Sequence, residues 1–96
     1  MSRRVIRFFV AGRVQGVGFR NFLVREASAL GVDGWARNRS DGSVEAVAAG
    51  PEHVVAAFLE AARRGPSAAR VDRLWEAPAG AAELAGVTGF GMAPTL

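Results

Sequence analysis

Three glycines stand close to an arginine in the nine residues 12–20, GRVQGVGFR, of this 96-residue chain. The segment joins an apolar run to a run with helical spacing. A glycine-rich loop between a strand and a helix can turn several backbone N–H groups toward one point, and the helix N-terminus adds partial positive charge there. Arg20 supplies a planar, permanently charged guanidinium group that suits phosphate oxygens. The pattern therefore predicts an anion-binding loop.

A second interpretation of the same loop stays open on the residues alone. The glycines can serve only a tight turn between strand and helix, with Arg20 as a solvated residue of the first helical turn. The position of Arg20 favours the anion site, because the helix dipole disfavours a cation near a helix N-terminus unless an anion lies beside it.

Several residue types that enzymes commonly use are missing from the chain. There is no cysteine and no tyrosine, all 12 basic residues are arginine, and His53 is the single histidine. These absences exclude disulfides, cysteine nucleophiles, Schiff-base chemistry and the lysine of a Walker-type nucleotide loop. One histidine without cysteine also argues against a transition-metal site. We therefore expect neither a metal nor a cofactor, and we expect His53 to be a surface residue.

Composition and charge indicate where the protein is located and which partners it can bind. Half of the residues are apolar, the formal net charge is +3, and the arginines are scattered along the chain. The apolar stretches are too short to span a bilayer, and the N-terminus has no signal-peptide core. We expect a cytoplasmic monomer that binds no membrane. The scattered charge also argues against nucleic acid as a partner.

Hydrophobic periodicity predicts the elements that must position the loop. The order is βαββαβ with one extra terminal strand, for which a two-layer ferredoxin-like α+β sandwich is the natural fit, with a mostly antiparallel sheet and two helices on one face. We expect a single domain over residues 1–96. The predicted elements are strands at 4–11, 32–37, 43–49, 69–76 and 87–92, helices at 19–30 and 52–64, and a loop at 78–86.

Strand alternation also predicts which side chains face the core. Ile6, Phe8 and Val10 should be buried, and Arg7 should lie on the opposite, open face of the sheet. Open sheet faces of this fold class can bind RNA by stacking bases on aromatic side chains. Here the first strand offers only Phe9, and the third offers Glu45, which makes a poor platform. Trp35 and Trp75 are expected to be packing residues.

Two further segments accompany the loop, GWARN at 34–38 and DGSVE at 41–45. Together with the loop motif they resemble acylphosphatase, and the resemblance covers nearly the whole chain, including RVDR at 70–73 and TGF at 88–90. The family's ferredoxin-like fold agrees with the element order above. A similar segment also occurs within a larger carbamoyl-phosphate enzyme, an alternative that a chain of one domain disfavours.

The resemblance implies hydrolysis of an acyl phosphate to a carboxylate and inorganic phosphate. It implies that Arg20 clamps the phosphoryl group and that Asn38 holds the attacking water, whereas Asn38 alone would be an ordinary turn residue. Asn21 departs from a commonly aromatic position and is expected to affect packing alone. Arg39 either favours anionic substrates or is simply solvated, and we expect the second. The implied phosphate-binding residues, acting through backbone N–H groups, are Gln15, Gly16, Val17, Gly18, Phe19 and Arg20.

The missing residue types suit this reaction. A carboxylate is a good leaving group and needs little protonation, so a general acid can be absent. Phosphoryl transfer is catalysed mainly by positioning and by stabilisation of charge, which arginine and backbone amides supply.

Overall fold

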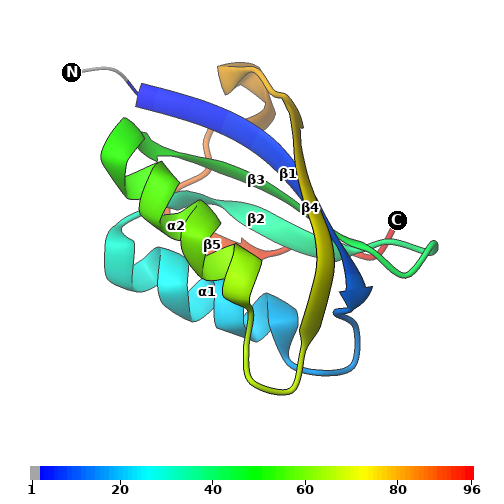
Figure 1. Ribbon diagram of the computed structural model, residues 1–96. Coiled ribbons are helices and arrows are strands. Elements are labelled where there is room, and N and C mark those ends of the chain that lie inside the picture. The colour runs from blue at the N-terminus through cyan, green and yellow to red at the C-terminus, as the bar shows by residue number, and fades with distance from the viewer. Residues whose placement is uncertain (1–2) are drawn as a thin grey trace.

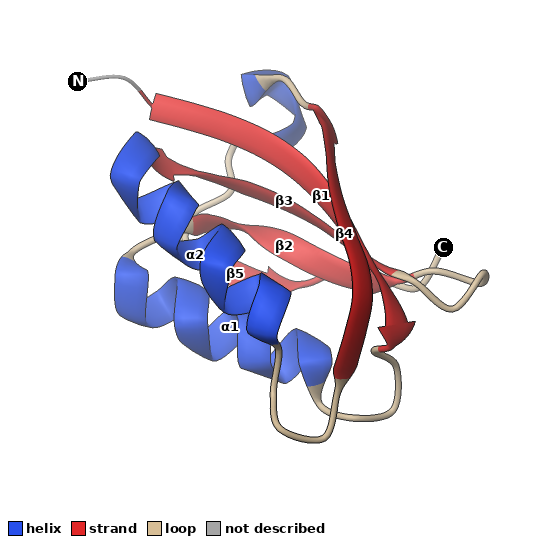
Figure 2. Cartoon of the chain, in the orientation of Figure 1, coloured by secondary structure: helices blue, strands red, loops and turns tan. Residues whose placement is uncertain are grey.

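A five-stranded sheet carries two helices on one face in the computed structural model, which describes residues 3–96 (Figures 1 and 2). Both helices and the order of the strands agree with the expected ferredoxin-like arrangement. The elements are β1 (Arg3–Arg13), α1 (Phe19–Leu30), β2 (Asp33–Asn38), β3 (Val44–Pro51), α2 (Glu52–Arg64), β4 (Arg70–Pro78), the short 3-10 helix η1 (Ala81–Leu84) and β5 (Phe90–Met92).

The strands lie in the order β4-β1-β3-β2-β5. β1 pairs antiparallel with β3 and β4, and β2 pairs antiparallel with β3, whereas β5 runs parallel to β2. The expected hairpin of β2 and β3 and the mostly antiparallel sheet are thus confirmed. The crossovers through α1 and α2 place both helices over the same face, and the start of α1 comes to lie beside the end of β2.

The main core fills the space between the helices and the sheet. Ile6, Phe8 and Val10 of β1 are buried there, as the alternation predicts. The Phe58 ring of α2 packs edge-on against Phe8 at 5.9 Å and against Phe90 at 5.3 Å between centroids. Burial of these large rings contributes about 2 kcal/mol each. Through Phe58, α2 therefore packs against both β1 and β5.

Three places differ most from the sequence-based expectation, and the remaining strand ends shift by one or two residues. Gly12 and Arg13 belong to β1 and not to the loop, because the pairing with β4 continues through both residues after a shift in register between Ala11 and Gly12. A Cβ on Gly12 would lie 2.2 Å from the carbonyl oxygen of Arg70, so only glycine fits there. The final strand is only three residues long, and the expected loop at 78–86 contains η1. Such a short helix leaves no periodic signal.

The open face of the sheet carries a buried carboxylate. The side chain of Glu45 is only 2% exposed and pairs with Arg7, with Arg37 at 2.9 Å and with Arg39 at 2.9 Å. The expectation of a solvated Arg39 is therefore wrong. Alternation places residue 45 on this face, but the three arginines that cover it come from two strands and the turn after β2. Arg7 also pairs with Glu83 of η1.

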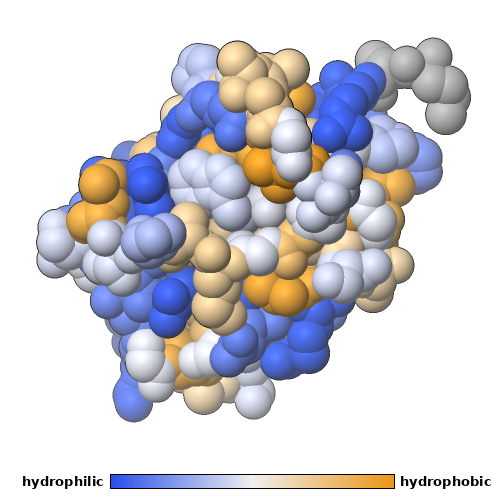
Figure 3. All heavy atoms as spheres, turned by 180° about the vertical axis from the view of Figure 1, so that it is seen from behind, coloured by the Kyte–Doolittle hydropathy of each residue, from blue (hydrophilic) through white to orange (hydrophobic). Residues whose placement is uncertain are grey.

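The aromatic rings on the open face are already in contact with arginines. Guanidinium groups lie 4.8 Å from the Trp35 ring centre and 4.3 Å from that of Trp75, which in turn stacks on Phe9 at 5.2 Å. Both tryptophans are packing residues as expected, but on the open face and outside the main core. Figure 3 shows this side with hydrophilic side chains between smaller hydrophobic patches. RNA bases could stack on these tryptophan rings only by displacing the arginines that already lie over them.

The ion pairs between Glu45 and three arginines are expected to stabilise the folded protein, and a substitution of Glu45 tests this. Burial alone would raise the pKa of Glu45, but the hydrogen bonds from Arg37, Arg39 and Arg7 outweigh it and hold the pKa below the ordinary 4.5. We expect Glu45→Gln to lower the free energy of unfolding by about 2 kcal/mol at pH 7, because three guanidinium groups lose their shared anion. Urea titration measures this change.

The pH dependence of the same variant has a defined sign. Because the folded-state pKa is depressed, the stabilisation by Glu45 is complete above pH 4.5 and is lost as the pH falls through the folded-state value. The difference between wild type and Glu45→Gln should therefore shrink in acid. Glu76→Gln is the matched control, since its pair with Arg4 at 2.9 Å is partly exposed and should contribute under about 1 kcal/mol. Equal losses in both variants would contradict a special role for Glu45.

Candidate functional site

The loop between β1 and α1 is shaped by glycines with left-handed backbone angles. Gly16 has φ 73° and Gly18 has φ 77°, a region that other residues adopt only with strain. Gly18 is the N-cap of α1, and the first helical hydrogen bond runs from the Phe22 N–H to its carbonyl oxygen at 2.9 Å. The N–H groups of Phe19, Arg20 and Asn21 precede this bond and belong to the unpaired first turn of the helix.

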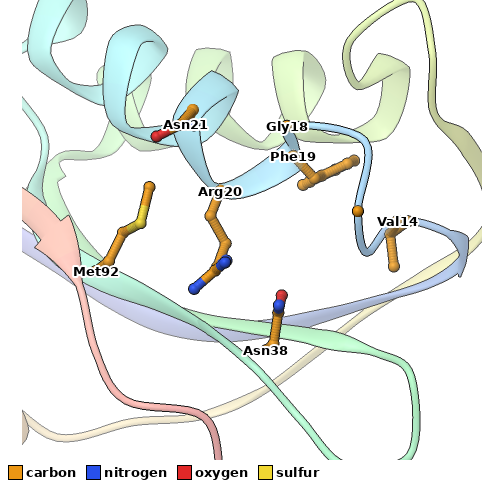
Figure 4. A pocket seen from close by; sticks show the side chains of 8 residues that line it. Val14, Gly18, Phe19, Arg20, Asn21, Asn38 and Met92 are labelled. Carbon is orange, nitrogen blue, oxygen red and sulfur yellow. The ribbon is translucent and has the colours of Figure 1, made fainter.

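A small pocket opens where this loop faces the end of β2. Its volume is about 130 Å³, which admits a small group and leaves the remainder of a larger ligand outside. The side chains of Arg20, from the first turn of α1, and Asn38, from the end of β2, both point into it (Figure 4). Its lining residues are Val14, Gly16, Gly18, Phe19, Arg20, Asn21, Asn38 and Met92.

Arg20 gives the pocket its charge. Within residues 3–96 it makes no ion pair, in contrast to Arg7, Arg37 and Arg39 on the open face. The first turn of α1 holds no acidic residue among those described. The positive end of the helix dipole and the guanidinium group therefore act on the same point without internal compensation. This arrangement favours an anion in the pocket.

The position of Asn38 is fixed by contacts of its own backbone and by the contacts of its two neighbours in the chain. It pairs with Val44 of β3, and its carbonyl oxygen accepts a hydrogen bond from the Leu96 N–H at 3.1 Å. Its neighbours Arg37 and Arg39 extend to the open face, where both bind Glu45. Asn38 has the same strand parity as the buried Ala36, so its amide faces the helices. The strand thus presents the amide to the pocket from a fixed backbone.

The expected phosphate-binding residues divide into two groups in the structure. Four of them line the pocket together with Asn38, namely Gly16, Gly18, Phe19 and Arg20. The other two do not line it. Val17 packs against the main core, and the Gln15 side chain reaches the turn between β2 and β3.

Three pocket residues were outside the sequence-based site. Met92 comes from β5 and is 46% exposed at the pocket rim, a place that only the parallel pairing of β5 with β2 determines. Val14 is buried under the loop. Its apolar side chain directly before Gln15 is the sequence signal that could have identified it. Asn21 is exposed and is among the residues that line the pocket, so it does not pack in the core.

Residues 3–96 contain no group of three or more His, Asp or Glu side chains placed to hold a metal ion. In the same range, no helix has the length and apolar character needed to cross a membrane. His53 is exposed at the start of α2, away from the pocket, as expected.

The fold and the pocket define a small α+β protein with a cationic pocket between a helix start and a strand end. The family model described as "Acylphosphatase" matches residues 6–90 of the chain. A relative named acylphosphatase in Nitrobacter hamburgensis is 54% identical over 81 residues, which are 84% of this chain and 82% of the relative. The chain therefore belongs to the acylphosphatase family, which consists of enzymes that hydrolyse acyl phosphates.

Solved structures agree with this assignment. The crystal structure of acylphosphatase from Bacillus subtilis matches with a TM-score of 0.81 and 37% identity, covering 96% of this chain and 99% of that one. A structure titled full-length HypF in the phosphate- and nucleotide-bound form matches with a TM-score of 0.80 and 22% identity. It covers 99% of this chain but 13% of that one, and it shows the fold alone.

Proposed function

We propose that this protein hydrolyses the carboxyl–phosphate bond of acyl phosphates, with the phosphoryl group held by the loop from Gln15 to Arg20 and the water oriented by Asn38. The observation that carries the proposal is the meeting of Arg20 and Asn38 in one small pocket at the start of α1. The guanidinium fork and the N–H groups of the loop supply donors for the phosphoryl oxygens. The Asn38 amide supplies a polar group on the opposite wall.

The reaction needs only these groups. The water oxygen forms a bond to phosphorus while the bond from phosphorus to the carboxylate oxygen breaks, and the leaving group keeps the electron pair as a carboxylate. The proton from water passes to a phosphoryl oxygen of the substrate, which completes inorganic phosphate. Arg20 and the backbone N–H groups stabilise the charge on the phosphoryl oxygens in a loose transition state.

The small volume of the pocket limits what the protein recognises. About 130 Å³ holds the phosphoryl end of a substrate, and the acyl end must extend past the rim formed by Asn21 and Met92. We therefore expect several acyl phosphates to be substrates, because the tightly held part is common to all of them.

Turnover of benzoyl phosphate by the purified protein, with a chelator present, tests the proposed function. We expect hydrolysis to persist in chelator, since arginine and backbone groups supply the positive charge. A simple alkyl phosphate is the matched control and should react far more slowly, because an alkoxide leaving group needs a proton that the site has no acid to give. Equal rates on both substrates, or loss of activity in chelator, would contradict the mechanism.

A further inference from the structure

The side chain of Gln15 joins the loop before α1 to the turn that follows Asn38. Its Nε2 atom donates to the carbonyl oxygen of Arg39 at 2.8 Å and to that of Ser43 at 2.9 Å. Both partners are acceptors only, so the group that faces them must be the NH₂ with its two hydrogens and not the amide oxygen. The side chain is half-buried, which strengthens both bonds relative to exposed ones.

The two acceptors are the carbonyl groups that close the turn itself. The Arg39 N–H donates to the Ser43 oxygen at 2.9 Å, and the Gly42 N–H donates to the Arg39 oxygen at 3.1 Å. Gln15 therefore binds the two carbonyl oxygens that also accept the closing hydrogen bonds of the turn. Its side chain is tied to both ends of the turn at once. A shift of the turn relative to the loop would break at least one of the two bonds.

The ends of this connection lie next to the groups that face each other in the pocket. Gly16, which follows Gln15, lines the pocket, and Arg39 directly follows Asn38. The Arg39 side chain is separately bound to Glu45 on the open face. The backbone at Asn38 is thus held from the open face by Glu45 and from the loop by Gln15.

We propose that Gln15 is a positioning residue, which sets the placement of the phosphate-binding loop relative to Asn38 through its side chain. The inference rests on the proposed function, in which the loop holds the phosphoryl group and Asn38 holds the water. The attack needs both partners at a defined separation, and a displacement of about 1 Å is enough to cost about 100-fold in rate. This role differs from the backbone contact with phosphate that the family resemblance implies for Gln15.

The first test compares Gln15→Met with wild type. Methionine keeps the length and burial of the side chain but has no donor. We expect kcat for benzoyl phosphate to fall by about 10- to 100-fold. The inhibition constant of inorganic phosphate should change by less than about twofold, because the loop still binds phosphate when its distance from Asn38 is wrong. A rise in this constant that matches the fall in kcat would overturn the proposal, since it would mean that Gln15 only shapes the loop.

A double-mutant cycle with Asn38→Ala gives the sharper result. If Gln15 acts through Asn38, Gln15→Met should lower kcat by less than about threefold once the Asn38 amide is gone. The same fold-change in both backgrounds would overturn the proposal. Asp41→Ala is the matched control, because Asp41 stabilises the same turn through two bonds from Ser43, at 2.9 and 2.6 Å, without touching Gln15. A loss of kcat in this control as large as in Gln15→Met would likewise overturn it.

Gln15→Glu keeps the proposal testable if the methionine variant does not fold. The protonated carboxyl group can donate to one carbonyl oxygen, whereas the ionised form repels both. We expect kcat of this variant, relative to wild type, to fall as the pH rises through the titration of the new carboxyl group. A constant ratio across that range would contradict the proposal. An inactive wild type would instead reject the proposed function, and with it the role of Gln15 in the reaction, so the two failures are distinct.

Discussion

Arg20→Gln is expected to lower kcat/KM for an acyl phosphate by about 1,000-fold or more. Loss of a single neutral donor to a developing oxyanion costs about 100- to 1,000-fold, and this variant removes a charge as well as a planar pair of donors. In residues 3–96 no other guanidinium group lines the pocket, so nothing nearby replaces it. Steady-state kinetics with benzoyl phosphate measures the loss. Activity near the wild-type level would reject the proposed function of the pocket.

Two variants control for charge and for folding. Arg25→Gln removes the same charge from an exposed position on the same helix and should leave activity unchanged. Arg20→Lys keeps the charge without the planar fork and should fall between wild type and Arg20→Gln. The helix dipole opposes a cation in the first turn, so Arg20→Gln should be as stable as wild type or up to about 1 kcal/mol more stable. A large loss of stability would mean that its inactivity reflects unfolding.

Asn38→Ala should produce the second largest effect, a fall in kcat of about 100-fold. If the amide orients water, its contribution appears chiefly in the transition state, and binding of inorganic phosphate should change by only a few-fold. Kinetics at saturating substrate and inhibition by phosphate measure the two effects separately. A parallel loss of turnover and phosphate binding would show that Asn38 contacts the phosphoryl group and not the water.

Ser40→Ala serves as the control for Asn38. Ser40 lies in the same turn, is exposed, and is held through its backbone N–H, which donates to the Leu96 oxygen at 2.8 Å. Its side chain can be shortened without changing that bond, so activity should match wild type. If Ser40→Ala were as slow as Asn38→Ala, the effect of the asparagine variant would come from the turn and not from the amide.

Local patterns predicted most of the fold. The alternation around Phe8 predicts a strand with one buried face, and the spacing from Phe19 to Leu30, closed by Gly31, predicts α1 with its observed bounds. These signals succeed because strand and helix periods are properties of neighbouring residues. For the same reason the final strand was predicted with too early a start and the 3-10 helix η1 was missed, since three or four residues hold too little of any period. Their positions depend on pairing with β2 and on burial of Leu84.

The candidate site was predictable in part. The loop motif predicts Arg20, and the family resemblance that the GWARN segment helps to carry implies Asn38. The structure brings both into one pocket. Met92 carries no such signal, because its place beside the pocket depends on β5 adding to the far edge of β2. Asn21 was identified as unusual, but only the position of α1 shows that it lines the pocket.

The sequence by itself determined the element order, the glycine turn before α1 and the residue types available for chemistry. Each of these follows from a residue and its near neighbours along the chain. Tertiary structure alone decided that Glu45 is buried among three arginines and that Gln15 binds the turn after Asn38. Both outcomes depend on how far apart separate segments lie once the sheet is paired and the helices are packed. Alternation can assign a side chain to a face, but only the folded chain determines its partner.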